Sequence, residues 1–369
     1  MSASKQFTVA VIGRTGKGNY GHGLDTVWLN QPRAKLIAVA DENEAGRAAA
    51  LKRLNLTKGY ADYREMLATE KPQIVSVADR WLDCHAPMVK ACADAGASIF
   101  LEKPVARSLV EADAMVKACD VAHVKCAIAH QTRYNPAVDH AKRFLADGGI
   151  GEIVEIRARG KEDHRGGGQD LMVLGTHLFD LMRYLVGDPR WCHAQIWQDD
   201  RIATKADIRM GGEQMGPVLG NRIIAQYGFA RGIIGHFGTQ IATDNRGKRF
   251  GMMIYGTKGM MHFFEVGGLS PVRYCLDPSW SGEKAPWQPI SSQGVDKPEV
   301  IQGESSLPFG NRIIVNDLMD AIEQDRAPRG SLADGRAALE MILAVYESHR
   351  VGKPVDLPLK NRQHPLEIS

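Results

Sequence analysis

A lysine follows a short apolar strand in the segment that contains Glu102, Lys103 and Pro104. The strand is predicted over residues 98–101, far downstream of a glycine-rich turn near the N-terminus. A lysine at such a strand end lies at the carboxyl edge of a parallel sheet, where α/β sheets bind ligands. Its ammonium can hydrogen-bond a substrate oxygen and stabilise a developing alkoxide. Lys103 is therefore a candidate catalytic residue; the alternative is a solvated lysine at a strand end.

A glycine-rich turn follows the first predicted strand, residues 7–12. Gly16, Gly18 and Gly21 fit the pattern GxGxxG, and Gly13 comes directly after the strand, so the turn is longer than usual. Glycines let the backbone approach a pyrophosphate closely, and a helix start after them offers free N–H groups to the anion. The position after a buried strand favours a dinucleotide-binding turn over a plain glycine-rich loop.

An acidic pair, Asp41 and Glu42, ends the second predicted strand. A carboxylate there accepts hydrogen bonds from the adenosine ribose hydroxyls and repels a 2′-phosphate. The pair therefore predicts NAD as the cofactor and disfavours NADP. Asp41 could also cap the next helix, which is compatible with the first role.

The elements that position these residues alternate between strands and helices in the first third of the chain. Continuous apolar runs are typical of strands buried on both faces. Such runs and the Ala-, Leu-, Lys- and Glu-rich segments between them predict a doubly wound parallel sheet. The strands are expected at residues 7–12, 35–40, 73–78, 98–101 and 124–129, and helices at 44–54, 86–95 and 109–121.

The pattern changes after about Tyr134. A helix, a one-sided strand and a nearly all-apolar helix are followed by a strand-rich stretch, and two helices close the chain. Residues 266–310, rich in Gly, Pro and Ser, are predicted to be long loops. Helices are expected at 136–146, 171–186, 315–323 and 332–350, and strands at 153–158, 222–229, 232–240, 250–255 and 260–265.

Composition limits the classes of protein that fit. The 369 residues, 44% hydrophobic and 24% charged, are ordinary for a soluble globular protein of two domains. A net charge of +3 without a long basic run does not indicate nucleic acid. Neither a signal peptide nor a membrane span is expected. The six cysteines form no CxxC pair and lack metal-ligand spacing, which favours free thiols in a reducing cytoplasm and no metal site.

In these residues and their order, the chain closely resembles the Gfo/Idh/MocA oxidoreductases, named for glucose–fructose oxidoreductase and inositol dehydrogenase. The resemblance implies a Rossmann domain over residues 1–133. It also implies an α/β domain over 134–369, whose large, open, mostly antiparallel sheet covers the substrate site and often forms subunit contacts. A homo-oligomer, dimer or tetramer, follows as an expectation. The matching segments are the Rossmann start, His85, residues 102–104, 133–136, 148–152, 175–180, 255–259 and 334–340.

The resemblance places Lys103 near the nicotinamide and the reacting hydroxyl, and makes His177 the proton acceptor. A neutral imidazole can take a hydroxyl proton as hydride leaves, although a histidine in an apolar helix can also be a core residue. The family carries an aspartate four residues before this histidine, whereas this chain has Val173. Asp180, one turn after His177, matches a family acid and is expected to orient it.

Asp170 is a candidate substitute for the missing acid. On one continuous helix it would lie about 10.5 Å along the axis from His177, too far for a direct hydrogen bond. It could bind a substrate hydroxyl or cap the helix, and the sequence leaves both open. The charged loop before it, residues 161–168, could close over a substrate or be solvated.

The expected site residues form three groups. The catalytic group is Lys103, His177 and Asp180. Substrate contacts are expected from Lys161, His164, Arg165, Asp170, Arg133 and Tyr134. Cofactor contacts are expected from Gly13, Arg14, Thr15, Gly16, Gly18, Asp41, Glu42, Asp79, His85, Glu102 and Gln131.

These residues predict an NAD-dependent enzyme that oxidises a secondary hydroxyl of a sugar, glycoside or inositol-type polyol. The first alternative is a glycoside hydrolase that uses NAD transiently, through oxidation at C3, elimination, water addition and re-reduction. A cofactor-binding regulator without catalysis is the second, and the presence of both Lys103 and His177 disfavours it. Formation of NADH from a free sugar separates the dehydrogenase from the hydrolase.

Overall fold

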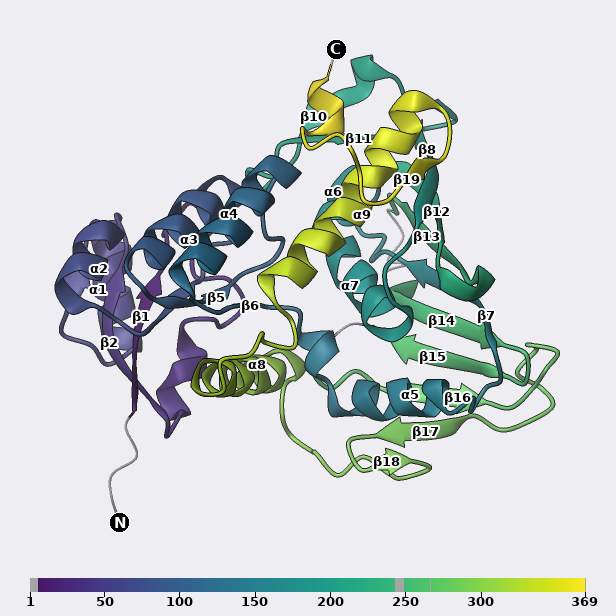
Figure 1. Cartoon of the computed structure of the whole chain (residues 1–369), viewed down its shortest axis with the longest axis horizontal. Coiled ribbons are helices and arrows are strands. Elements are labelled where there is room, and N and C mark those ends of the chain that lie inside the picture. The colour runs from purple at the N-terminus through teal and green to yellow at the C-terminus, as the bar shows by residue number, and fades with distance from the viewer. Residues whose placement is uncertain (1–5, 243–248, 266, 369) are drawn as a thin grey trace. The chain divides into compact units, whose positions relative to one another are not determined.

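The computed structural model describes residues 6–242, 249–265 and 267–368, which form two compact units (Figure 1). Unit 1 runs to Ala129 and also contains Glu213–Met215 and Leu307–Arg336. Unit 2 consists of His130–Gly212, Gly216–Ser306 and Ala337–Ser369. A domain boundary between residues 133 and 134 stays a prediction.

Unit 1 is built on a six-stranded parallel sheet in the order β3-β2-β1-β4-β5-β6. Its central strands are apolar and buried along nearly their whole length, because helical segments cover both faces of such sheets. The order reverses between β1 and β4, the point at which doubly wound sheets bind ligands. The predicted doubly wound sheet is confirmed. The strands are β1 (Phe7–Ile12), β2 (Ala34–Ala40), β3 (Gly59–Tyr60), β4 (Ile74–Val77), β5 (Ser98–Leu101) and β6 (Cys126–Ile128).

The helices of unit 1 differ from the predicted ones in three places. The helix predicted over residues 315–323 begins earlier, at Ser306. The short, largely polar helix α2 was not expected. After β1 the chain forms turns and then only a 3-10 helix, residues Thr26–Asn30, so the helix start expected after the glycine turn is absent from this stretch. Glycines at positive φ at positions 16, 18, 21 and 23 keep the backbone out of the helical region. The α-helices are α1 (Glu44–Arg53), α2 (Tyr63–Glu70), α3 (His85–Asp94), α4 (Leu109–Ala122) and most of α8 (Ser306–Glu323).

Unit 2 contains an eleven-stranded sheet, in which β14 and β15 lie side by side in Figure 1. The pair β7 and β13 is parallel and the other described pairs are antiparallel, so the predicted mostly antiparallel sheet is confirmed. The strands are β7 (Ile153–Arg159), β8 (Trp191–Gln198), β9 (Arg201–Ile202), β12 (Arg222–Gly228), β13 (Ile234–Gln240), β14 (Gly251–Gly256), β15 (Met260–Phe264), β16 (Val272–Cys275), β17 (Gln288–Ser291), β18 (Gly294–Val295) and β19 (Val355–Asp356).

Two sequence expectations for unit 2 were wrong. Residues 266–310 hold the three short strands β16, β17 and β18 and the start of α8, rather than loops alone. The helix expected over residues 171–186 is broken into α6 (Gly168–Val173) and α7 (Gly175–Val186). At the break, the His177 N–H donates to the Leu174 carbonyl at 3.2 Å, so the chain tightens there into a 3-10-type turn.

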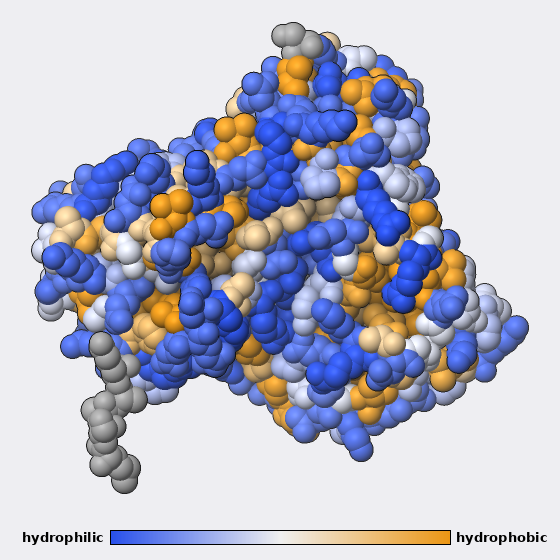
Figure 2. Space-filling view, viewed as in Figure 1, coloured by the Kyte–Doolittle hydropathy of each residue, from blue (hydrophilic) through white to orange (hydrophobic). Residues whose placement is uncertain are grey.

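The helices of unit 2 also include α5 (Pro136–Ala146), which begins where predicted with a proline in its first turn, and most of α9 (Leu332–Val351). A short two-stranded ribbon, β10 (Ile208–Met210) and β11 (Pro217–Leu219), completes the unit. None of the helices in the described ranges is long and apolar enough to cross a membrane. The face of the molecule in Figure 2 shows hydrophilic residues interspersed with small apolar groups.

Candidate active site

The glycine turn after β1 is closed by backbone hydrogen bonds between Arg14 and Asn19, at 2.9 and 3.2 Å. Gly16 and Gly18 adopt φ values of +82° and +102°, at which the backbone of a residue with a side chain would be strained. A Cβ on Gly18 would lie 1.7 Å from a carboxylate oxygen of Asp79. Gly18 is therefore required both for its conformation and for its close approach to the end of β4.

Asp41, at the end of β2, holds this turn in place and is 1% exposed. Its carboxylate accepts from the Thr15 N–H at 3.1 Å, the Thr15 hydroxyl at 2.7 Å and the Tyr20 hydroxyl at 2.9 Å. The Asn43 N–H donates a fourth bond at 3.0 Å. Burial and the Asp41 charge raise the pKa of Tyr20, so its phenol stays a donor. Asp41 thus organises the turn, whatever it binds in addition.

A cavity of about 330 Å³ lies beside the ends of β1 and β2. Its size and its place at the carboxyl ends of parallel strands suit part of a dinucleotide. Glu42 at this cavity pairs with Lys17 at 2.6 Å, and both side chains are 51% exposed. Predicted cofactor residues Gly13, Arg14, Asp41 and Glu42 line the cavity together with Ile12, Ala40, residues 61–64 and Met88.

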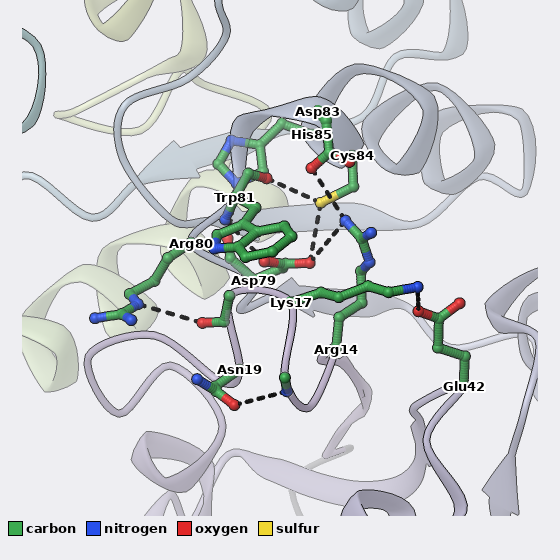
Figure 3. A network of polar contacts seen from close by, with 12 residues as sticks. Arg14, Lys17, Asn19, Glu42, Asp79, Arg80, Trp81, Asp83, Cys84 and His85 are labelled. Atoms are coloured by element: carbon green, nitrogen blue, oxygen red, sulfur yellow. Dashed lines mark hydrogen bonds and ion pairs between the residues drawn. The ribbon is translucent and has the colours of Figure 1, made fainter. Parts of the chain in front are cut away.

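Arg14 is anchored to the end of β4, as Figure 3 shows. Its guanidinium lies 3.2 Å from Asp79 and 3.1 Å from Asp83. Asp79 is fully buried and also accepts from the Trp81 N–H at 2.8 Å and the Cys84 thiol at 3.2 Å. Burial raises the pKa of Asp79 despite these donors. The contacts make Asp79 a support for Arg14 at the edge of the cavity.

Lys103 is the second residue after β5 and is 7% exposed. Its neighbour Glu102 is fully buried and lies 2.8 Å from Nδ1 of His22. Burial alone would raise the pKa of Glu102, but the hydrogen bond and charge of His22 outweigh it and lower the pKa. His85, predicted to contact the cofactor, instead has two backbone carbonyl oxygens at 2.7 and 3.1 Å from its ring nitrogens. These contacts fasten α3 to the ends of β4 and β5.

In unit 2, His177 lies in the first turn of α7 and is 8% exposed. Asp180 was expected to orient it, but the Asp180 carboxylate is held by Arg133, with N–H···O distances of 2.6 to 3.1 Å. Burial would raise the pKa of Asp180, yet the charges of Arg133 and His130 lower it strongly. Arg133, expected at the substrate, is therefore bound in a buried ion pair, because leaving either charge alone in the interior would be costly.

His130 and Thr176 were missed by the sequence reasoning. Nδ1 of His130 lies 3.5 Å from Asp180, and its Nε2 lies 2.9 Å from the Thr176 hydroxyl. The rings of His130 and His177 meet edge to face, with centroids 5.5 Å apart. No motif marks this group, because the contacts join residues almost fifty positions apart. Gln131 and Tyr134 are buried in the adjoining 3-10 helix, Gln131–Tyr134.

Asp170 is fully buried near the start of α6. Its carboxylate accepts from the backbone N–H groups of Lys161 and Glu162 at 3.2 and 3.3 Å and from the hydroxyl of Thr239 on β13. Burial raises its pKa. Asp170 therefore fastens the loop to the sheet, and the single-helix geometry that related it to His177 was wrong because the helix breaks at Leu174.

The charged loop offers mainly two accessible side chains. His164 is 86% exposed at its side chain, and Lys161 is also exposed. Arg165 pairs with Asp163 at 2.6 Å, a contact that lowers the pKa of Asp163 to about 2. The structure thus brings Gly13, Arg14, Asp41 and Glu42 together at one cavity of unit 1. In unit 2 it collects His130, Arg133, Thr176, His177 and Asp180 into one buried cluster.

Comparisons with known proteins agree with this geometry. Residues 7–130 match the family model described as "Oxidoreductase family, NAD-binding Rossmann fold". Residues 142–357 match the family's "C-terminal alpha/beta domain". The predicted NAD-binding Rossmann domain is thereby confirmed.

Individual relatives are sugar and polyol dehydrogenases. The chain is 26% identical over 364 residues to a levoglucosan dehydrogenase of Pseudarthrobacter phenanthrenivorans, covering 89% of this chain and 90% of the relative. It is 28% identical to the NAD(+) scyllo-inositol 2-dehydrogenase of Bacillus subtilis, over 49% of this chain and 54% of the relative. A solved levoglucosan dehydrogenase in complex with NADH and levoglucosan shares the fold, with a TM-score of 0.77 at 23% identity, covering 96% of this chain and all of that one.

The family models together span most of the chain, and the named relatives do not favour the redox-assisted glycosidase. The chain belongs to the Gfo/Idh/MocA family of NAD-binding oxidoreductases.

Proposed function

We propose that this enzyme is an NAD-dependent dehydrogenase that oxidises a secondary hydroxyl of a sugar, glycoside or inositol-type polyol. The observation that carries the proposal is the pairing of an NAD-binding Rossmann sheet with a lysine at the end of β5. Ligands bind at this edge of such sheets, so the ammonium lies where a reacting oxygen needs a donor. Relatives named for sugar and inositol oxidation support the substrate class.

NAD supplies the hydride acceptor. The glycine turn, the Asp41 carboxylate and the cavity beside β1 and β2 would hold its adenosine and pyrophosphate portions. Arg14, braced by Asp79, adds a positive charge at the cavity edge. Cofactor roles for Thr15, Gly16, Gln131 and Glu102 remain part of the proposal.

Two residues carry the reaction in this proposal. Lys103 donates a hydrogen bond to the reacting hydroxyl oxygen and stabilises negative charge on it. His177 accepts the hydroxyl proton as its neutral imidazole. The exposed His164 and Lys161 contact the other substrate hydroxyls; Tyr134, Arg165 and Asp170 support the loop and helix around them.

The test is Lys103→Met, assayed by NADH formation at a panel of sugars and polyols and, in parallel, by aglycone release from glycosides. Turnover should fall by roughly 10²–10⁴-fold, the usual contribution of a general acid–base group. NAD affinity should change less than about tenfold, because the glycine turn and Asp41 hold the dinucleotide. Lys90→Met, at an exposed lysine paired with Asp94, is the matched control. Retention of more than about a tenth of the activity would remove Lys103 from the reaction centre.

A homo-oligomer formed through the unit 2 sheet is also proposed. Strand register places four side chains on one face of this sheet, where Arg222 lies over Trp197 at 4.7 Å and Arg273 over Phe264 at 4.1 Å. Arginine and large aromatics are enriched in protein interfaces. Light scattering should give a dimer or tetramer, and Phe264→Asp should lower the mass; a monomeric wild type would refute the proposal.

A cytoplasmic location is proposed from the cysteines. All six thiols are free and buried. Free thiols persist in reducing compartments. Fractionation of the native host should recover the enzyme in the cytoplasm; recovery in an oxidising compartment would contradict this.

A further inference from the structure

A buried polar cluster in unit 2 adjoins His177. Arg133, Asp180, His130 and Thr176 are 5%, 1%, 1% and 2% exposed, whereas His177 is 8% exposed and is the most accessible of the five. The residues come from the 3-10 helix Gln131–Tyr134, the residue before it, and the first turns of α7. Burying polar groups is costly unless contacts within the cluster offset the hydration that they lose.

The contacts of His130 define the orientation of its ring. Asp180 is ionised, since the Arg133 charge at 2.6 Å stabilises its carboxylate. Nδ1 of His130 faces this carboxylate at 3.5 Å, within ion-pair range. Nε2 lies 2.9 Å from the Thr176 hydroxyl, within hydrogen-bond distance. The hydrogen-bond contact at Nε2 and the carboxylate facing Nδ1 together restrain rotation of the imidazole.

His177 packs against this fixed ring. The two imidazoles meet at 65° with centroids 5.5 Å apart, within the range of edge-to-face aromatic pairs. Thr176, the neighbour of His177 in sequence, is tied to the same His130 ring. Val173, the last residue of α6, has an apolar side chain and is 4% exposed. The ring of His130 is thus one surface against which His177 packs.

We propose that His130 is a positioning residue: locked by Asp180 and Thr176, its ring holds the imidazole of His177 in the orientation that accepts the substrate proton. The inference rests on the proposed function, in which His177 is the proton acceptor. His130 itself does not touch the substrate. Its effect on catalysis passes through His177, and this makes the idea separable from a general structural role.

The experiment is a double-mutant cycle on the full-length enzyme with NAD and an active sugar substrate. His130→Phe keeps a ring of similar size but removes both nitrogens, and Thr176→Val removes the hydroxyl that contacts Nε2. In the wild-type background each should lower kcat on the order of tenfold to a hundredfold, with KM and NAD affinity changed less than about threefold, because misorientation of a reacting group costs rate rather than binding. His140→Gln, on α5 and bonded to Arg143, is the matched histidine control and should leave kcat unchanged.

The deciding measurement repeats His130→Phe in a His177→Ala background. If His130 acts through His177, the second substitution should change the residual rate less than about twofold. An equal fold-loss in both backgrounds, or an unchanged kcat in His130→Phe, would overturn the inference while leaving the proposed function intact. An active His177→Ala would instead remove the proposed proton acceptor. Where His130→Phe proves unstable, Thr176→Val, which keeps the His130 ring, serves in the same cycle.

Discussion

Replacing Asp41 by alanine should destabilise the protein and weaken NAD binding together. The substitution removes the acceptor of four hydrogen bonds, from Thr15 (two), Tyr20 and Asn43, at a site only 1% exposed. Hydrogen bonds to a charged group contribute about 1.5–3 kcal/mol each, and neutral ones about 1 kcal/mol. Water entering from the adjacent cavity would satisfy some of the stranded donors. With water satisfying two of the four donors, loss of the other two bonds at about 1.5 kcal/mol each should lower the free energy of unfolding by about 3 kcal/mol.

A neighbouring carboxylate provides the matched control. Glu42 makes one ion pair, with Lys17, and both side chains are half exposed. Exposed pairs of this kind contribute about 0–1 kcal/mol, so Glu42→Ala should have little effect on unfolding. Urea denaturation of the cofactor-free proteins measures the free energy of unfolding, and calorimetric titration measures the affinities for NAD and NADP. Asp41→Ala should weaken the binding of NAD. It should also narrow the difference in affinity between NAD and NADP, because the carboxylate's repulsion of a 2′-phosphate is lost.

The comparison of the two variants decides the argument. Unfolding free energies of Asp41→Ala and Glu42→Ala within about 0.5 kcal/mol of each other would refute the claim that Asp41 organises the turn. A wild type that prefers NADP would refute the role of the acidic pair in cofactor choice. Loss of stability without loss of NAD affinity would show that the carboxylate acts on the turn alone.

Three further outcomes can be checked directly. Burial, followed by the Arg273 charge, lowers the pKa of His262 to about 4, below the roughly 6.5 of an unfolded chain. The free energy of unfolding should therefore be highest above about pH 6.5 and should decrease as the pH falls toward 4. Urea titrations should show that this pH dependence is weaker in His262→Phe. Asp180→Asn leaves the buried Arg133 charge uncompensated and should cost about 3–5 kcal/mol in urea unfolding, whereas a loss below about 1 kcal/mol would contradict the buried pair. Val173→Asp adds a carboxylate near the proposed proton acceptor and should move the acid limb of the pH–rate profile to higher pH; an unmoved limb would place the acid out of reach.

The central elements could be predicted from the sequence because their signals are local. Fully buried parallel strands need continuous apolar runs, and such runs mark β1 and β5. Residues 266–310 were different: β16, β17 and β18 have two to four residues each and lie among Gly, Pro and Ser. Strands this short are stabilised by pairing with neighbours, which the local sequence does not record.

The site residues divide in the same way. Lys103, Asp41 and the glycine turn follow recognisable strands, so the carboxyl edge of the sheet determines where they lie. The partner of Asp180 could not be found from spacing, because one helical turn suggested His177 while the fold supplied Arg133 and His130 from another element.

By itself the sequence determined the Rossmann sheet, the residues at the ends of that sheet's strands, the family and the cofactor. These could be inferred because periodicity, glycine conformation and charge act over a few residues. Only the tertiary structure decided which groups satisfy the buried charges. A carboxylate such as Asp170 or Asp180 takes whichever donors the fold brings within hydrogen-bond reach once water is excluded. Those donors lie dozens of residues away in the chain, on loops and strands whose approach is set by packing.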